Sequence, residues 1–207
     1  MIALANLPAA LRKASACAAL ALAACATPPE PDVGAAAGGL YRVDPAHAIV
    51  SMWIGHLGLS RYPGRFADVS GALRFDPEDP TASRLEIEIP ARSIDLPDKS
   101  LEATIRGEDW LDARTHPTIR FVSTAAERLD EATGRVTGDL TIRGVTRAVT
   151  LDVAYNGSAP NPFNRRETLG FSATGAIDRA AFGMTALPGF VGATIDLVIE
   201  IEFIAAG

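Results

Sequence analysis

The residues of this chain that could carry chemistry are few, and their spacing organises no reaction centre. A serine hydrolase would usually show a Gly-x-Ser-x-Gly elbow, and the sequence contains none. The histidines are His47, His56 and His116. On one uninterrupted strand His47 and His56 would face opposite sides, so they could not share a tetrahedral metal ion. Without a Cys-x-x-Cys or His-Glu-x-x-His motif either, we predict no metal site and no catalytic residues.

The remaining polar candidates fit structural or surface roles. We expect His47 to form hydrogen bonds at the start of a strand, and His56 to be a buried polar group with a satisfied partner. The alternatives for His56 are a ligand contact, or the base of an enzyme that acts on a lipid. Asp95 and Asp98 lie in a polar connection and read as solvated surface. The pair Arg165–Arg166 reads as an exposed loop tip, the alternative being contact with an anionic head group.

The elements that would position these residues are mostly strands. From Val136 to Tyr155 apolar and polar side chains alternate on both sides of a break at Arg143–Gly144, which predicts a β-hairpin with one apolar face. The same alternation predicts further strands over residues 48–56, 66–75, 84–90, 118–123, 168–177 and 194–203. About eight antiparallel strands of this kind fit a closed barrel or a two-sheet sandwich.

Two connections depart from this pattern. Residues 91–117 form a long crossover with one short helix, which we expect to begin after Pro97 with Asp98 as its N-cap and to end at Gly107. Residues 179–193 are unusually apolar for a loop, so they should cover something. A barrel of about eight strands can be filled by its own side chains or can hold one slender ligand, and the sequence does not decide between them.

The N-terminus predicts export and a lipid anchor. Arg12 and Lys13 precede an Ala/Leu-rich run that is too short to span a bilayer, so residues 1–24 read as a signal peptide. The run ends in Leu-Ala-Ala-Cys25, which resembles the lipobox of bacterial lipoproteins and implies lipidation of Cys25 with cleavage before it. The alternatives are an ordinary secretory signal cut near Ala24, or a buried Ala-rich helix.

Cleavage before Cys25 would leave 183 residues and change the net charge from −6 to −8, because the removed segment holds two cations and no acid. Such an acidic chain is a poor nucleic-acid binder. Its size suits one domain, over residues 40–207. Residues 25–39 are rich in Pro, Gly and Ala and read as a flexible tether with an end-to-end distance of roughly 20 Å.

Several short motifs follow one another along the domain. The chain opens its domain with Tyr41-Arg-Val-Asp-Pro-Ala-His47, and the most specific match is Gly138-Asp-Leu-Thr-Ile-Arg-Gly-Val-Thr146. Further matches are His56-Leu-Gly58 with Gly64-Arg-Phe66, and Trp110-Leu-Asp112 with His116-Pro117-x-Ile119-x-Phe121. Together these motifs resemble the YceI-like family of exported, lipocalin-like, polyisoprenoid-binding proteins. Two departures from that family's pattern are Ala48, where it usually has Ser, and Ala181, which replaces an acid and puts a head-group contact in that loop in doubt.

The resemblance implies an all-β fold, an extended antiparallel lipocalin-like barrel around a long tunnel that holds an isoprenoid or another amphiphilic tail. The ligand-binding residues that we predict for the tunnel are Met52, Ile54, Phe75, Ile87, Phe121, Leu140, Leu151, Phe171, Leu197 and Ile199. Those that we predict near an opening are Trp110, Phe182 and Phe190.

These expectations describe an envelope protein that sequesters or carries a lipid such as a polyprenyl phosphate or a quinone, with no other cofactor and no enzymatic activity. The alternative is a structural or partner-binding barrel with a filled core. We expect the protein in the periplasm, held through Cys25 at the inner leaflet of the outer membrane, because Ala26 is not acidic. A homodimer is possible on this sequence.

Overall fold

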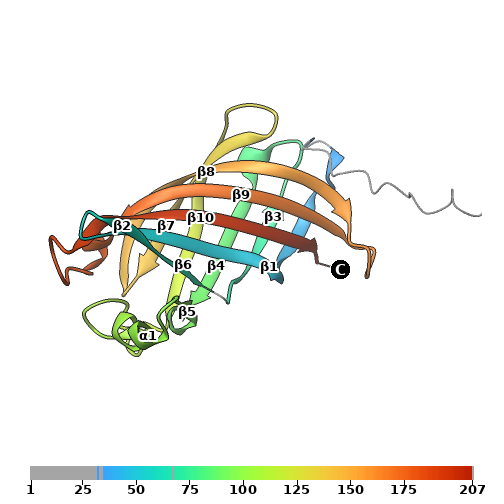
Figure 1. Cartoon of the computed structure of the whole chain (residues 1–207). Coiled ribbons are helices and arrows are strands. Elements are labelled where there is room, and N and C mark those ends of the chain that lie inside the picture. Colours follow the sequence, from blue (N-terminus) through green and yellow to red (C-terminus); the bar gives the residue numbers. More distant parts are fainter. Residues whose placement is uncertain (1–31, 33–34, 67, 207) are drawn as a thin grey trace, which may run out of the picture.

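The computed structural model describes residues 32, 35–66 and 68–206, and these form one antiparallel sheet rolled into a barrel (Figure 1). Its strands are β1 (Gly39–His56), β2 (Ser60–Phe66), β3 (Ser70–Phe75), β4 (Arg84–Pro90), β5 (Ile94–Asp95), β6 (Thr118–Arg128), β7 (Thr133–Ile142), β8 (Val145–Pro160), β9 (Glu167–Asp178) and β10 (Val191–Ala205). The helices are α1 (Lys99–Arg106) and three 3₁₀ turns, η3 (Pro80–Ala82), η4 (Ala91–Ser93) and η5 (Arg179–Phe182). None of the helices in this described part is long and apolar enough to cross a membrane.

Eight of the strands close the barrel. The sheet runs from β10 through β9, β8, β7, β6, β4 and β3 to β1, and β1 pairs with β10 again, from Tyr41 opposite Ala205 to His56 opposite Val191. The prediction of an all-β, closed antiparallel barrel of about eight strands with one helix is therefore confirmed. The hairpin turn also falls at Arg143–Gly144, where both residues have positive φ, as a tight two-residue hairpin turn requires.

The two ends of the barrel carry different connections. We call the end at which the chain enters the domain the entry end; it holds residues 35–38, 76–83, 129–132 and 161–166. We call the opposite end the helix end; it holds turn 57–59, crossover 96–117, turn 143–144 and loop 183–190. In Figure 1 α1 lies toward the left and the C-terminus at the right.

One strand expectation was wrong, because residues 66–75 do not form a single strand. The first four residues of β1 pair with β3, and its last seven residues pair with β2. Phe66 and Phe75 are both buried and both face the interior, although they have opposite parity. On one continuous strand they would face opposite sides, so the change of parity marks the break.

The crossover covers the barrel beside β2, which pairs with the second half of β1 in place of β3. At this edge of the sheet β2 is followed only by the two-residue strand β5. The crossover then places Leu96, Ile105 and Leu111 against the interior. Its helix has the predicted limits: Asp98 accepts a hydrogen bond from the Ser100 amide at 2.9 Å as the N-cap, and the helix ends at Gly107.

A bulge interrupts the seam between β1 and β10. Four residues of β1, Asp44 to His47, lie opposite the single residue Glu202. The Asp44 carboxylate lies 2.8 Å from Nδ1 of His47 and accepts a hydrogen bond from the Ala46 amide at 3.0 Å. The Glu202 carboxylate lies 3.8 Å from the same His47 nitrogen. His47 thus stabilises the bulge through its hydrogen bond with Asp44 and its ion pair with Glu202.

The pH dependence of this bulge follows from the two pKa shifts. The hydrogen bond to Asp44 raises the pKa of His47, and the hydrogen bond to His47 lowers the pKa of Asp44. The contribution of His47 to folding stability is complete below about pH 6.5 and is lost as pH rises through its raised pKa. The contribution of Asp44 is present above about pH 3.9 and is lost as pH falls through its lowered pKa. A double-mutant cycle of His47→Ala and Asp44→Asn, measured by urea unfolding, should give a larger coupling at about pH 5.5 than at about pH 9. Equal coupling at both values would contradict this assignment.

Gly138 on β7 allows an aromatic ring to lie against the backbone. A Cβ at this position would lie 2.4 Å from Cζ of Phe121 and 2.6 Å from the carbonyl oxygen of Val122. Gly138→Ala should therefore lower the free energy of unfolding by about 1–3 kcal/mol, measured by urea denaturation. Gly170→Ala is the matched control, because the nearest atom to its Cβ would be Cβ of Asn156 at 3.6 Å. Equal stability of the two variants would refute the packing argument.

Candidate functional site

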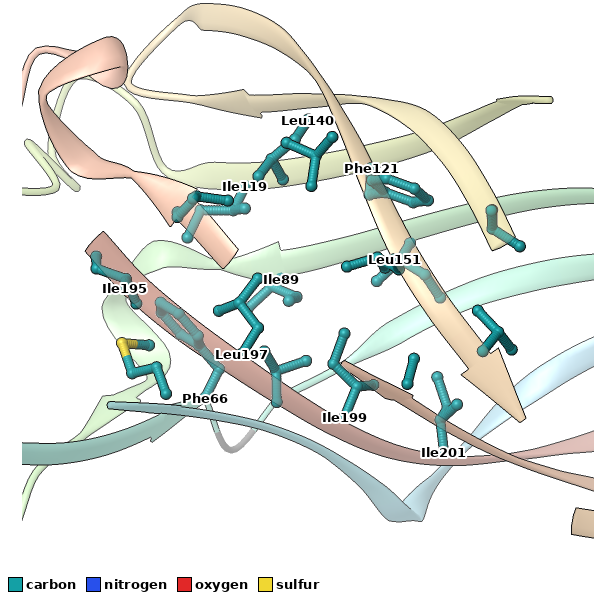
Figure 2. Close-up of a pocket in the computed structure, with 18 of the residues that line it drawn as sticks. Phe66, Ile89, Ile119, Phe121, Leu140, Leu151, Ile195, Leu197, Ile199 and Ile201 are labelled. Atoms are coloured by element: carbon teal, nitrogen blue, oxygen red, sulfur yellow. The ribbon is translucent and has the colours of Figure 1, made fainter. Parts of the chain in front are cut away.

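The barrel encloses an apolar cavity of about 660 Å³. This volume lies within the range of about 300–1,000 Å³ that is typical of small-molecule sites. Figure 2 shows side chains from several strands, among them Phe121, Leu151 and Ile199, pointing toward one another across this space. The inward faces therefore leave a hollow rather than a filled core.

Most of the predicted ligand-binding residues border this cavity. Eleven of the thirteen line it: Met52, Ile54, Phe75, Ile87, Trp110, Phe121, Leu140, Leu151, Phe171, Leu197 and Ile199. Period-two alternation accounts for the ten that lie on strands, because each inward parity of a closed barrel reaches the interior. Trp110 lies in the crossover, where alternation does not apply. Their contact with a ligand stays a prediction.

Phe182 and Phe190 do not line the cavity. Phe182 is the last residue of η5 and is buried in the core, whereas Phe190 is 61% exposed on loop 183–190. From the same loop, Met184 and Leu187 do line the cavity. The apolar composition of the loop thus indicated its position at the cavity, but it did not indicate which side chains turn inward.

An aromatic cluster borders the cavity toward the entry end. Tyr41, Phe75, Tyr155, Phe171 and Phe203 form a chain of ring contacts with centroids 5.3–6.4 Å apart. Such edge and offset contacts stabilise the fold beyond the burial of the rings. Burial raises the pKa of the Tyr155 hydroxyl, and burial together with the nearby Glu167 raises that of Tyr41. The hydroxyls therefore stay neutral at physiological pH.

Charged turn residues are a part of the lining that the sequence reasoning missed. Beside β3 and β4, Thr81 and Ser83 border the cavity, and across from them lies the β6–β7 hairpin tip. The charged lining residues of this tip are Glu127, Arg128, Asp130, Glu131 and Arg135. No alternation marks a turn, so only the proximity of two separate connections reveals this polar border.

Two arginines hold Trp110 in the cavity wall at the helix end. The buried side chain of Arg179 is 4% exposed; it donates hydrogen bonds to the carbonyls of Met184, Val191 and Gly192, and its guanidinium lies 5.2 Å from the Trp110 ring centroid. Arg143, from the β7–β8 turn, donates to the carbonyl oxygens of Glu108 and Trp110. These contacts connect the crossover with loop 183–190.

The histidines do not assemble a reaction centre in the described part of the chain. His56 is exposed at the end of β1, on the border of the cavity, so the expectation of a buried histidine was wrong. The described residues contain one set of potential metal ligands, Asp44, His47 and Glu202, whose ligand atoms lie within 4.8 Å of one another. Their hydrogen bond and ion pair already account for this grouping, and the absence of a metal site stays a prediction.

A closed antiparallel barrel around an apolar cavity is a lipocalin-like architecture, the class to which this fold and site correspond. Residues 41–203 match the YceI-like domain. The chain therefore belongs to the YceI-like family, as its motifs indicated. The signal peptide, Cys25 and most of the tether lie outside the described residues and stay predictions.

Known relatives agree with this assignment. A UPF0312 protein of Pseudomonas putida strain W619 is 36% identical over 171 residues, which cover 82% of this chain and 88% of the relative. The crystal structure of BcnA from Burkholderia cenocepacia superposes with a TM-score of 0.68 at 29% identity, covering 77% of this chain and 98% of that one. A polyisoprenoid binding domain from Saccharophagus degradans, implicated in plant cell wall breakdown, shares the fold with a TM-score of 0.61 at 11% identity and covers 82% and 100% of the two chains.

The role of Arg179 can be tested by stability. Arg179→Met keeps a long side chain but leaves one buried and two partly buried carbonyls without their donor, so the free energy of unfolding should fall by about 1.5–3 kcal/mol. Arg92→Met is the matched control, because Arg92 is exposed, and should change stability by less than about 0.5 kcal/mol. Equal urea midpoints for Arg179→Met and the wild type would show that the guanidinium does not hold the loop.

Proposed function

We propose that this protein sequesters or carries a long apolar molecule in the barrel cavity, and that it performs no reaction on it. The observation that carries the proposal is the hollow itself: about 660 Å³ of space bordered by inward apolar side chains in a barrel closed by backbone pairing. Packed interiors rarely contain voids larger than a water molecule, so an apolar hollow of this size supports a binding role.

The chemical class of ligand that fits best is an isoprenoid lipid, such as a polyprenyl phosphate or a quinone. The deep lining is aliphatic and aromatic, with Met52, Leu151 and Ile199 among its members. Burial of each methylene contributes about 0.8 kcal/mol, so a tail of about twenty carbons gains on the order of 16 kcal/mol. The loss of ligand freedom offsets roughly 4–15 kcal/mol of this gain. The likeness in fold to a polyisoprenoid binding domain supports the same class.

The cell envelope is the proposed place of action. The motif Leu-Ala-Ala-Cys25 after a basic and apolar N-terminus supports export and lipidation of Cys25, with the barrel held on the periplasmic side of the outer membrane. A lipid anchor would keep a lipid carrier beside its source. Lipid analysis of the processed protein, by mass spectrometry of its N-terminal peptide, tests this part independently of the cavity.

Filling the cavity should abolish binding without unfolding the barrel. Ala173 on β9 is buried and lines the cavity opposite Ile199 on β10. In Ala173→Phe the added ring enters vacant space, so we expect at least a tenfold loss of affinity for a fluorescent polyprenyl probe, with a cost in stability below the 1–3 kcal/mol typical of overpacked cores. Native mass spectrometry and organic extraction should recover a lipid from the wild type and little from this variant.

Ala176→Phe is the matched control. Ala176 lies on the same strand but is exposed and does not line the cavity. It should bind the probe like the wild type. Repeated recovery of empty wild-type protein that refuses every apolar probe would contradict the proposed function and favour a structural or partner-binding barrel.

A further inference from the structure

Exposed apolar side chains gather at the helix end of the barrel. Leu57 and Leu59 lie on the β1–β2 turn, Leu187 and Phe190 on loop 183–190, and Leu101 on α1; the exposed fractions range from 40% to 84%. Three segments far apart in the sequence thus present large apolar groups to solvent at the same end. A grouping of this kind marks a surface for a protein or a membrane.

These segments form one structural unit. The Leu57 amide donates a hydrogen bond to the Phe190 carbonyl at 2.8 Å, so the β1–β2 turn and loop 183–190 are joined. The hydroxyl of Tyr62 accepts a hydrogen bond from the Asp98 amide at 3.2 Å, which joins β2 to the start of α1. We call the five side chains Leu57, Leu59, Leu101, Leu187 and Phe190 the apolar rim.

The rim is continuous with the cavity. Leu101 and Leu187 are at once exposed to solvent and part of the cavity lining. At the entry end the cavity meets exposed residues of the β6–β7 tip that are charged, such as Glu127 and Arg128. A tail that leaves a bilayer avoids water only on an apolar path, and Leu101 and Leu187 provide such a path from the rim to the cavity.

We propose that the apolar rim docks this protein on the surface of a lipid bilayer and is the mouth through which the tail of the ligand enters. This inference rests on the proposed function, because it takes the cavity as a lipid site. Leu59 and Phe190 enter the boundary between head groups and acyl chains, as exposed apolar anchors of peripheral proteins do. The described chain enters the barrel at the opposite end, where β1 begins at Gly39.

The charge of the chain makes the mode of attachment testable. The net charge is −6, so the chain as a whole is repelled by anionic lipids. Rim insertion should therefore occur on vesicles of phosphatidylcholine alone. It should persist at about 1 M salt, where the Debye length is only about 3 Å. Binding that needed anionic vesicles and low salt would overturn the proposal.

The test uses a chain that begins at Ala26. It lacks Cys25 and the apolar run, which would bind membranes themselves, and it keeps every described strand and the β1–β10 closure. The rim variant is Leu59→Asp with Phe190→Asp. The matched control is Leu129→Asp with Phe163→Asp, which removes one exposed leucine and one exposed phenylalanine, 49% and 95% exposed, from the entry end.

Co-sedimentation with phosphatidylcholine vesicles should show at least a tenfold weaker partitioning of the rim variant, and the control should match the wild type. The rim variant should also transfer a fluorescent polyprenyl lipid between vesicles at least about tenfold more slowly. Unchanged circular dichroism and thermal midpoint verify the fold of each variant. Equal loss in both variants, or wild-type binding by the rim variant, would refute the docking surface.

Native mass spectrometry separates this inference from the proposed function. If the wild type holds a lipid but does not bind vesicles, the docking role of the rim is contradicted and the proposed cavity function stands. A wild type that binds vesicles through the rim but never holds a lipid supports docking and contradicts the cavity function. A wild type that self-associates through the rim and does not bind vesicles identifies a second copy as its occupant, and also overturns the proposal.

Discussion

The closure of the sheet between β1 and β10 is the interaction on which the rest of the structure depends. It converts two strands that would otherwise be edges into a continuous wall, so their backbone N–H and C=O groups find partners. A layered core holds its elements together by interdigitated side chains, and a large void would forfeit those contacts. Here the wall is held by its own ladder of hydrogen bonds, so the interior can stay hollow.

Side-chain packing and hydrogen bonds reinforce the wall of the cavity differently at the two ends of the barrel. Ring contacts between Tyr41, Phe75 and Tyr155 supply packing toward the entry end. At the helix end the wall includes irregular segments instead of strands, and Arg143 and Arg179 fix these segments through their backbone carbonyls. These connections carry an apolar surface but have no large hydrophobic core of their own. Charge-assisted hydrogen bonds hold them in place instead.

The sequence predicted the barrel and most of the cavity wall because both follow from alternation, which is a local pattern. Met52, Leu151 and Ile199 could be assigned to the interior by parity alone. What alternation could not supply was contact between distant segments. The break between Phe66 and Phe75 depends on which half of β1 each strand joins, and the orientations of Phe182 and Phe190 depend on the hydrogen bonds of a loop. The exposure of His56 likewise follows from the place at which β1 ends.

The chemistry of Arg179 bears on what the cavity can recognise. Its guanidinium is committed to three carbonyls and to the face of Trp110. A cation that is satisfied in this way is not directed at a ligand head group. The charged lining residues lie at the β6–β7 tip, and the deep wall is apolar. Selectivity would then come from the length and shape of the tail, because a wall of aliphatic and aromatic groups distinguishes ligands by the surface they bury rather than by their charge.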